Sequence, residues 1–172
     1  MHTSNANKVA KIAIFVALGV VLQIADSAIL LPINIPGGKL GLANIINIYS
    51  LISFSPAISL SIAIIRAIIG GLLFGGIMSA MYSMIGAVLS MLVMIVLYKK
   101  FYGKLSFIGI GILGAATHNL GQVTLAAILL GSGAVYAYLP VLLIIGTISG
   151  SLVGYIGERF TNAKDNSSIG VA

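Results

Sequence analysis

The sequence contains no cysteine and very few acidic residues. Without cysteine the chain forms no disulfide, holds no metal through thiolates and has no redox pair. Of its 172 residues only 3 are Asp or Glu, and Glu158 and Asp165 lie near the C-terminus. Too few carboxylates remain for paired-acid catalysis or for an aspartate-rich Mg²⁺ clamp on a diphosphate.

Motifs for other chemistry are missing as well. The two histidines, His2 and His118, do not form a metal pair, and the chain has no GxxxxGK[ST] loop for ATP phosphates. We therefore predict a protein that is not an enzyme and needs neither cofactor nor metal. The net charge of +6 does not indicate nucleic-acid binding, because the basic residues are not clustered with aromatic residues on a polar face.

Hydrophobic residues make up 59% of the chain and charged residues 7%, whereas soluble domains have about 45 to 50% apolar residues. This composition predicts an all-α integral membrane protein with one membrane domain over residues 1–172. Breaks in the apolar sequence divide it into six predicted transmembrane helices, at 8–31, 42–54, 57–74, 77–98, 105–130 and 135–158. The first is longer than a signal-peptide core and is interpreted as a mature helix.

Positive charges alternate in abundance between the predicted loops. One side would hold Lys8, Lys11, Lys99, Lys100, Lys104, Arg159 and Lys164, and the other only Lys39. The positive-inside rule therefore predicts a multi-pass protein of a cell membrane, prokaryotic by inference, with both termini cytoplasmic and the 32–41 loop extracellular. The polar tail, 161–172, is predicted to be disordered.

Arg66 lies alone within the apolar run 58–74. A guanidinium stays charged at that depth and needs a partner. The other polar residues at membrane depth are Gln23, Asp26, Asn44, Asn47, His118, Asn119 and Gln122. Asn44 and Asn47 are three residues apart and His118 and Gln122 four apart, so each pair shares a helix face.

Two interpretations of these residues remain open. In one, Arg66 pairs with Asp26 and the amides join helices, which is the favoured role for Gln23. In the other, an outward-facing pocket binds a small molecule, beneath a gating loop at Gly37, Gly38 and Lys39. The predicted substrate-binding residues are Asn44, Asn47, Arg66, His118, Asn119 and Gln122, because arginine binds carboxylate or phosphate and the others bind carbonyls or hydroxyls.

Small residues recur at helical spacing on the first and last predicted helices. Ala10, Ala13 and Ala17 share one face, and Gly146, Gly150 and Gly154 share another. Such faces pack helices together in lipid. They serve either packing within this chain or docking onto a second membrane protein.

Four stretches resemble a known family: Gly41-Leu-Ala-Asn44-Ile-Ile-Asn47, Arg66-Ala-Ile-Ile-Gly70, Met84-Ile-Gly86-Ala-Val-Leu-Ser90-Met91 and Ala116-Thr-His118-Asn119-Leu-Gly121-Gln122. They resemble the Gx transporter family, also labelled heptaprenyl diphosphate synthase component I, over nearly the whole chain. That family is similar to the S components of energy-coupling factor (ECF) transporters, which are six-helix bundles. In those proteins an Ala-xxx-Ala face on the first helix docks onto a transmembrane coupling subunit with two cytoplasmic ATPases, and Ala13 and Ala17 match it.

Three alternative functions remain open, and the resemblance implies the first two. The first is a substrate-capture subunit of an ATP-driven importer for a vitamin-like or isoprenoid- or quinone-related molecule, docked through Ala10, Ala13 and Ala17. The second is a non-catalytic accessory subunit of a polyprenyl diphosphate synthase. The third is a stand-alone gradient-driven carrier, which Asp26, as the only membrane carboxylate, makes the weakest of the three.

Overall fold

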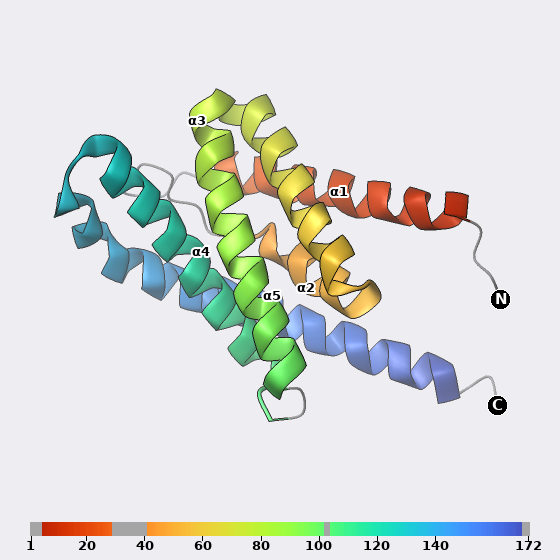
Figure 1. Ribbon diagram of the computed structural model, residues 1–172. Coiled ribbons are helices and arrows are strands. Elements are labelled where there is room, and N and C mark those ends of the chain that lie inside the picture. Colours follow the sequence, from red (N-terminus) through yellow and green to blue (C-terminus); the bar gives the residue numbers. More distant parts are fainter. Residues whose placement is uncertain (1–4, 29–40, 102–103, 170–172) are drawn as a thin grey trace.

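The computed structural model describes residues 5–28, 41–101 and 104–169, and these residues form helices without any strand. The helices are α1 (Asn5–Ala28), α2 (Asn44–Ser53), α3 (Pro56–Phe101), α4 (Phe107–Leu130), the 3₁₀ helix η1 (Gly133–Tyr138) and α5 (Leu139–Ile169) (Figure 1). The predicted gating loop, Gly37 to Lys39, lies outside the described residues.

Among the described residues, α1, α3, α4 and the segment from η1 into α5 are long and apolar enough to cross a membrane. Large side chains on their outer faces are exposed, such as Leu73 at 70% and Ile144 at 65%, as expected for contact with lipid tails. The chain is therefore a membrane protein. By contrast, α2 has 10 residues, a length of about 15 Å against a hydrocarbon layer of about 30 Å.

The 46-residue helix α3 folds back on itself at Gly75 and Gly76. Gly76 has φ 70° and ψ −161°, a backbone conformation that only glycine adopts readily. The two halves run side by side in opposite directions (Figure 1), and they correspond to the segments predicted at 57–74 and 77–98. They approach closely, since a Cβ atom on Gly71 would lie 2.3 Å from Ala80 Cα.

The last helices are delimited by local signals. The Ser106 side chain caps α4 by accepting a hydrogen bond from the Gly109 amide at 3.2 Å, and Gly131 ends it with φ 62°. One difference from the prediction is that α5 continues to Ile169, through much of the tail predicted to be disordered. Its physical reason is that no glycine or proline interrupts the chain between Gly157 and Gly170, so nothing in this stretch breaks the helix.

Glycines bring α4 and α5 into backbone contact. A Cβ atom on Gly150 would lie 2.6 Å from the Gly111 carbonyl oxygen, and one on Gly154 would lie 2.3 Å from Ile108 Cα. Gly146 faces the Asn119 side chain on α4 in the same way. The small-residue face of α5 is thus used for packing within the chain.

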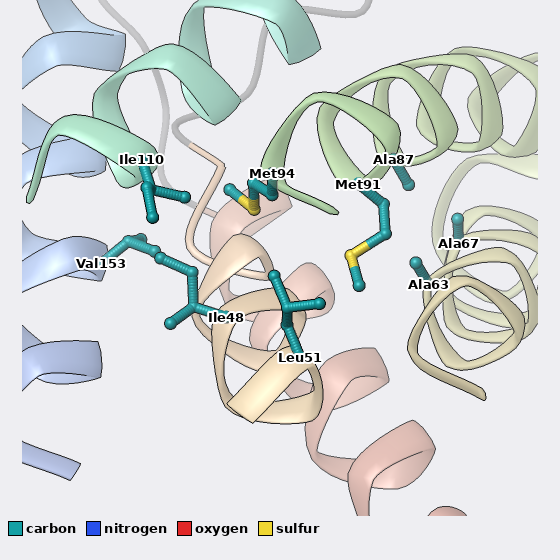
Figure 2. Close-up of a cluster of buried hydrophobic side chains, with 9 residues drawn as sticks. All are labelled: Ile48, Leu51, Ala63, Ala67, Ala87, Met91, Met94, Ile110 and Val153. Carbon is teal, nitrogen blue, oxygen red and sulfur yellow. The ribbon is translucent and has the colours of Figure 1, made fainter. Parts of the chain in front are cut away.

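The main apolar core forms where α2, both halves of α3, α4 and α5 converge (Figure 2). Its buried members are Ile48, Leu51, Ala63, Ala67, Ala87, Met91, Met94, Ile110 and Val153. Ring contacts hold α2 at its edges, with Phe54 packed on Phe15 at 5.1 Å and Tyr49 on Phe160 at 4.1 Å between centroids. The start of α1 and the end of α5 lie on the same side of the molecule (Figure 1).

Candidate functional site

Arg66 is 2% exposed on the first half of α3 and is held by two neutral side chains. Its Nε and Nη2 atoms donate to Asn47 Oδ1 at 3.3 and 3.0 Å, and its Nη1 atom donates to Gln23 Oε1 at 3.4 Å. Both partners are buried, Asn47 on α2 and Gln23 on α1. The guanidinium therefore joins three helices through amide oxygens.

The amides extend this network in both directions. The Asn47 Nδ2 atom donates to Asn44 Oδ1 at 3.0 Å, within α2. The Gln23 Nε2 atom donates to Ser83 Oγ at 3.1 Å and to the Ala67 carbonyl at 3.3 Å. Arg66, the two asparagines and Gln23 thus connect α1 and α2 with both halves of α3.

A small cavity of about 10 Å³ lies beside the network. Its lining residues are Gln23, Asp26, Gly41, Ala43, Arg66, Ser83 and His118. The Asp26 carboxylate accepts a hydrogen bond from the Gly41 amide at 2.8 Å, which fixes the end of α1 to the turn before α2. A cation, a carboxylate and an imidazole therefore border one space, which is about large enough for a single water molecule.

Glycines provide the room for these polar side chains. A Cβ atom on Gly19 would lie 2.5 Å from Arg66 Cδ, and one on Gly86 would lie 2.8 Å from His118 Cε1. Real Cβ atoms do not approach other atoms so closely, so alanine at either position would displace the arginine or the imidazole. The Arg66 and His118 positions are consequently encoded in residues on neighbouring helical segments.

Gln122, one helical turn beyond His118, is fully buried. Among the described residues its Nε2 and Oε1 atoms have no hydrogen-bond partner, and the same holds for Asn44 Nδ2 and Ser90 Oγ. A buried polar group without a partner costs about 1 to 3 kcal/mol and calls for an explanation such as a ligand. Gln122 has both a donor and an acceptor available.

Of the six predicted site residues, Asn44, Asn47 and Arg66 are joined by hydrogen bonds. His118 borders the small cavity together with Arg66, and Gln122 lies one turn further along α4. Asn119 points elsewhere, since its Nδ2 atom donates to the Leu142 carbonyl on α5 at 2.8 Å. That hydrogen bond is a helix-to-helix contact.

Three residues that border the cavity were not in the predicted binding set, namely Gln23, Asp26 and Ser83. Gln23 and Asp26 are three residues apart on α1, and that shared helix face is a signal that could have grouped them. Ser83 had no such signal, because serine is frequent at helix contacts in membranes.

No group of three or more metal-ligating His, Cys, Asp or Glu side chains occurs in the described part of the chain. Ala10, Ala13 and Ala17 are exposed on α1, unlike the glycines of α5. They remain available for a contact outside this chain.

Comparison with protein families supplies one match. The family model described as heptaprenyl diphosphate synthase component I matches residues 15–160, which include every residue of the buried network. Comparisons with curated proteins and with solved structures find no match. The chain belongs to the heptaprenyl diphosphate synthase component I family.

Proposed function

We propose that this protein is the substrate-binding membrane subunit of an ATP-driven importer for a small molecule. The observation that carries the proposal is the fully buried Gln122 amide, whose donor and acceptor are both unmet among the described residues. A helix in lipid gains nothing from such a group unless something binds it. Gln122 lies one helical turn from His118, and His118 borders the small cavity at Arg66.

The network is suited to a ligand that carries both an anionic group and carbonyls or hydroxyls. Carboxylate or phosphate forms stronger, charge-assisted hydrogen bonds with a guanidinium than neutral amide oxygens do. Such a group could replace Asn47 and Gln23 as the acceptors for Arg66. The released amides would then bond the rest of the ligand, and vitamin-like and isoprenoid- or quinone-related molecules are the proposed class.

The proposed topology follows the positive-inside rule, with both termini cytoplasmic and six helical segments. The five longer segments, α1, the two halves of α3, α4 and the segment from η1 into α5, would leave the termini on opposite sides. The proposed topology therefore requires α2 to return the chain across part of the bilayer. Its shortness is compatible with that role, because Asn44, Asn47, Ser50 and neighbouring residues are buried inside the protein and do not face lipid.

Energy for uptake would come from partners, since the chain has no phosphate-binding loop for ATP. The proposed partners are a transmembrane coupling subunit and two cytoplasmic ATPases. The exposed Ala10, Ala13 and Ala17 face supports this docking, since small residues let helices from different chains approach closely.

The family description favours a second candidate, an accessory membrane subunit of a polyprenyl diphosphate synthase. Purification of the full chain in mild detergent separates the two functions. Co-purification of a coupling subunit with ATPases supports the importer, and co-purification of a soluble, aspartate-rich synthase supports the accessory role.

Ligand binding is tested by mass spectrometry of the small molecules that remain bound after gentle purification. Gln122→Leu removes the unmet amide while keeping a similar volume, so we expect the variant to be at least as stable as the wild type but to retain no ligand. Thr117→Val is the matched control on α4, because within the described part of the chain the Thr117 hydroxyl bonds only to carbonyls of its own helix. An unchanged ligand in Gln122→Leu would refute the site.

A further inference from the structure

A second, much larger space lies between α1, α2 and α5, apart from the arginine network. It is an open groove of about 850 Å³, within the range of about 300 to 1,000 Å³ that is usual for ligand sites. Its lining residues are Lys8, Lys11, Ile14, Phe15, Leu18, Ile45, Ile46, Tyr49, Ser53, Phe54, Ile156 and Phe160. None of them borders the small cavity at Arg66.

The groove is charged at one end and apolar along its length. Lys8 and Lys11 are exposed and lie three residues apart, on one face of α1. Ile14 and Leu18 continue that wall and are 56% and 50% exposed, with Leu18 about 15 Å from Lys8 along the helix axis. None of the described residues that line the groove is acidic.

The shape of the walls favours a flexible chain over a helix. Helices that associate in lipid meet through small residues, whereas the described lining residues include neither glycine nor alanine. Successive residues of a helix are rotated by about 100°. Ala10, Ala13 and Ala17 therefore lie on a different side of α1 from the residues that line the groove. An acyl chain fits between bulky Ile, Leu and Phe side chains without close backbone approach.

We propose that this groove binds an anionic phospholipid, with the phosphate between Lys8 and Lys11 and an acyl chain along Ile14 and Leu18. Basic pockets between transmembrane helices on the cytoplasmic side bind anionic lipid headgroups by this combination of charge and apolar surface. The lysine stems can lie along the apolar wall while their ammonium groups reach the phosphate. The proposal does not depend on the substrate site at Arg66.

The test uses the full chain, which contains no tryptophan, so a single Ile14→Trp substitution supplies the only indole. In vesicles, brominated phosphatidylglycerol or brominated phosphatidylcholine quenches this indole by contact. We expect phosphatidylglycerol to reach half-maximal quenching at a severalfold lower mole fraction. Lys8→Gln and Lys11→Gln should each weaken this preference, and the double substitution should abolish it. A second reporter, Tyr49→Trp, places the indole on the α2 wall of the groove. It keeps the test valid if the larger side chain of Ile14→Trp fills the groove.

The control reporter is Val96→Trp. Val96 is 49% exposed on α3 and lies close to Lys99 and Lys100 in the sequence, but it does not line the groove. An equal preference for phosphatidylglycerol at Val96→Trp would mean that anionic lipid is attracted to the whole basic surface, and it would overturn the proposal. The same holds if Lys99→Gln with Lys100→Gln abolishes the preference at the groove reporters. Absence of quenching by either lipid at both groove reporters would show that protein covers the groove. Displacement of phosphatidylglycerol by much lower concentrations of farnesyl diphosphate would assign it to an isoprenoid diphosphate instead.

Discussion

Arg66 and Asn47 form the central contact of the buried network, with two guanidinium nitrogens donating to one amide oxygen at 3.3 and 3.0 Å. The contact fixes α2, a helix too short to cross the bilayer, to the first half of α3. A single neutral oxygen thus serves both as a structural link and as the group that an anionic ligand would replace.

Replacing Asn47 separates these two roles. Asn47→Leu leaves two donors of a buried charge without their acceptor, and we expect a loss of about 3 kcal/mol of unfolding free energy, measured by thermal denaturation in detergent. Asn47→Asp supplies a charged acceptor and should keep the fold while it competes with an anionic ligand. Equal stability of Asn47→Leu and the wild type would contradict the structural role of this contact.

The imidazole of His118 depends on the space at Gly86. A Cβ atom there would lie within 2.9 Å of three ring atoms, so Gly86→Ala should cost about 1 to 3 kcal/mol and reduce ligand retention. Gly133→Ala is the matched control, since its Cβ atom would meet nothing within 4 Å. Stability and retained ligand are measured on the same purified samples, and indistinguishable variants would refute this account of the His118 position.

The reversal within α3 rests on the backbone of Gly76. Gly76→Ala meets no atom within 4 Å, so any loss of stability measures conformational strain alone, expected at about 1 to 3 kcal/mol for this region of φ and ψ. Gly131 has φ 62° and ψ 23°, the left-handed helical region, which costs a non-glycine residue only about 1 to 2 kcal/mol. In unfolding experiments Gly76→Ala should therefore lose more stability than Gly131→Ala. The opposite ranking would contradict the described turn.

Bulky residues on α1 and on α5 should behave differently. Ala13→Leu with Ala17→Leu alters an exposed face, so we expect unchanged stability and ligand retention but loss of co-purification with the coupling subunit. Gly150→Leu forces a side chain against the α4 backbone, 2.6 Å from the Gly111 carbonyl, and should destabilise the monomer itself. Normal transport by the double alanine variant would remove the docking proposal.

Helix breaks and depths could be read from the sequence, whereas helix rotation could not. The Gly75-Gly76 break and the isolation of Arg66 are local signals that need no knowledge of neighbours. The surfaces of α3 and α4 are apolar on all sides, so hydrophobicity does not show which face meets which helix. His118 and Asn119 illustrate this limit, because adjacent residues point about 100° apart and one faces the cavity while the other bonds α5.

The contributions of α1 and α5 were harder to predict for other reasons. Gln23 was interpreted as an amide that joins helices, and its hydrogen bonds with Ser83 and Arg66 agree with this role. Its partners could not be named in advance, because a lone amide gives no indication of them. The extension of α5 to Ile169 was missed because the polar composition of this segment suggested disorder, although no glycine or proline interrupts it.

The 10 Å³ volume beside Arg66 has a kinetic consequence. A space that accommodates about one water is too small for the proposed vitamin-sized substrate, so under the proposed function α1 and the turn at Gly41 would have to separate from α3 and α4 before it binds. In that case the hydrogen bond between Asp26 and the Gly41 amide would have to break first, and the frequency of its opening would limit how fast substrate is captured at high concentration. Affinity would be lowered by the fraction of time that this hydrogen bond stays formed.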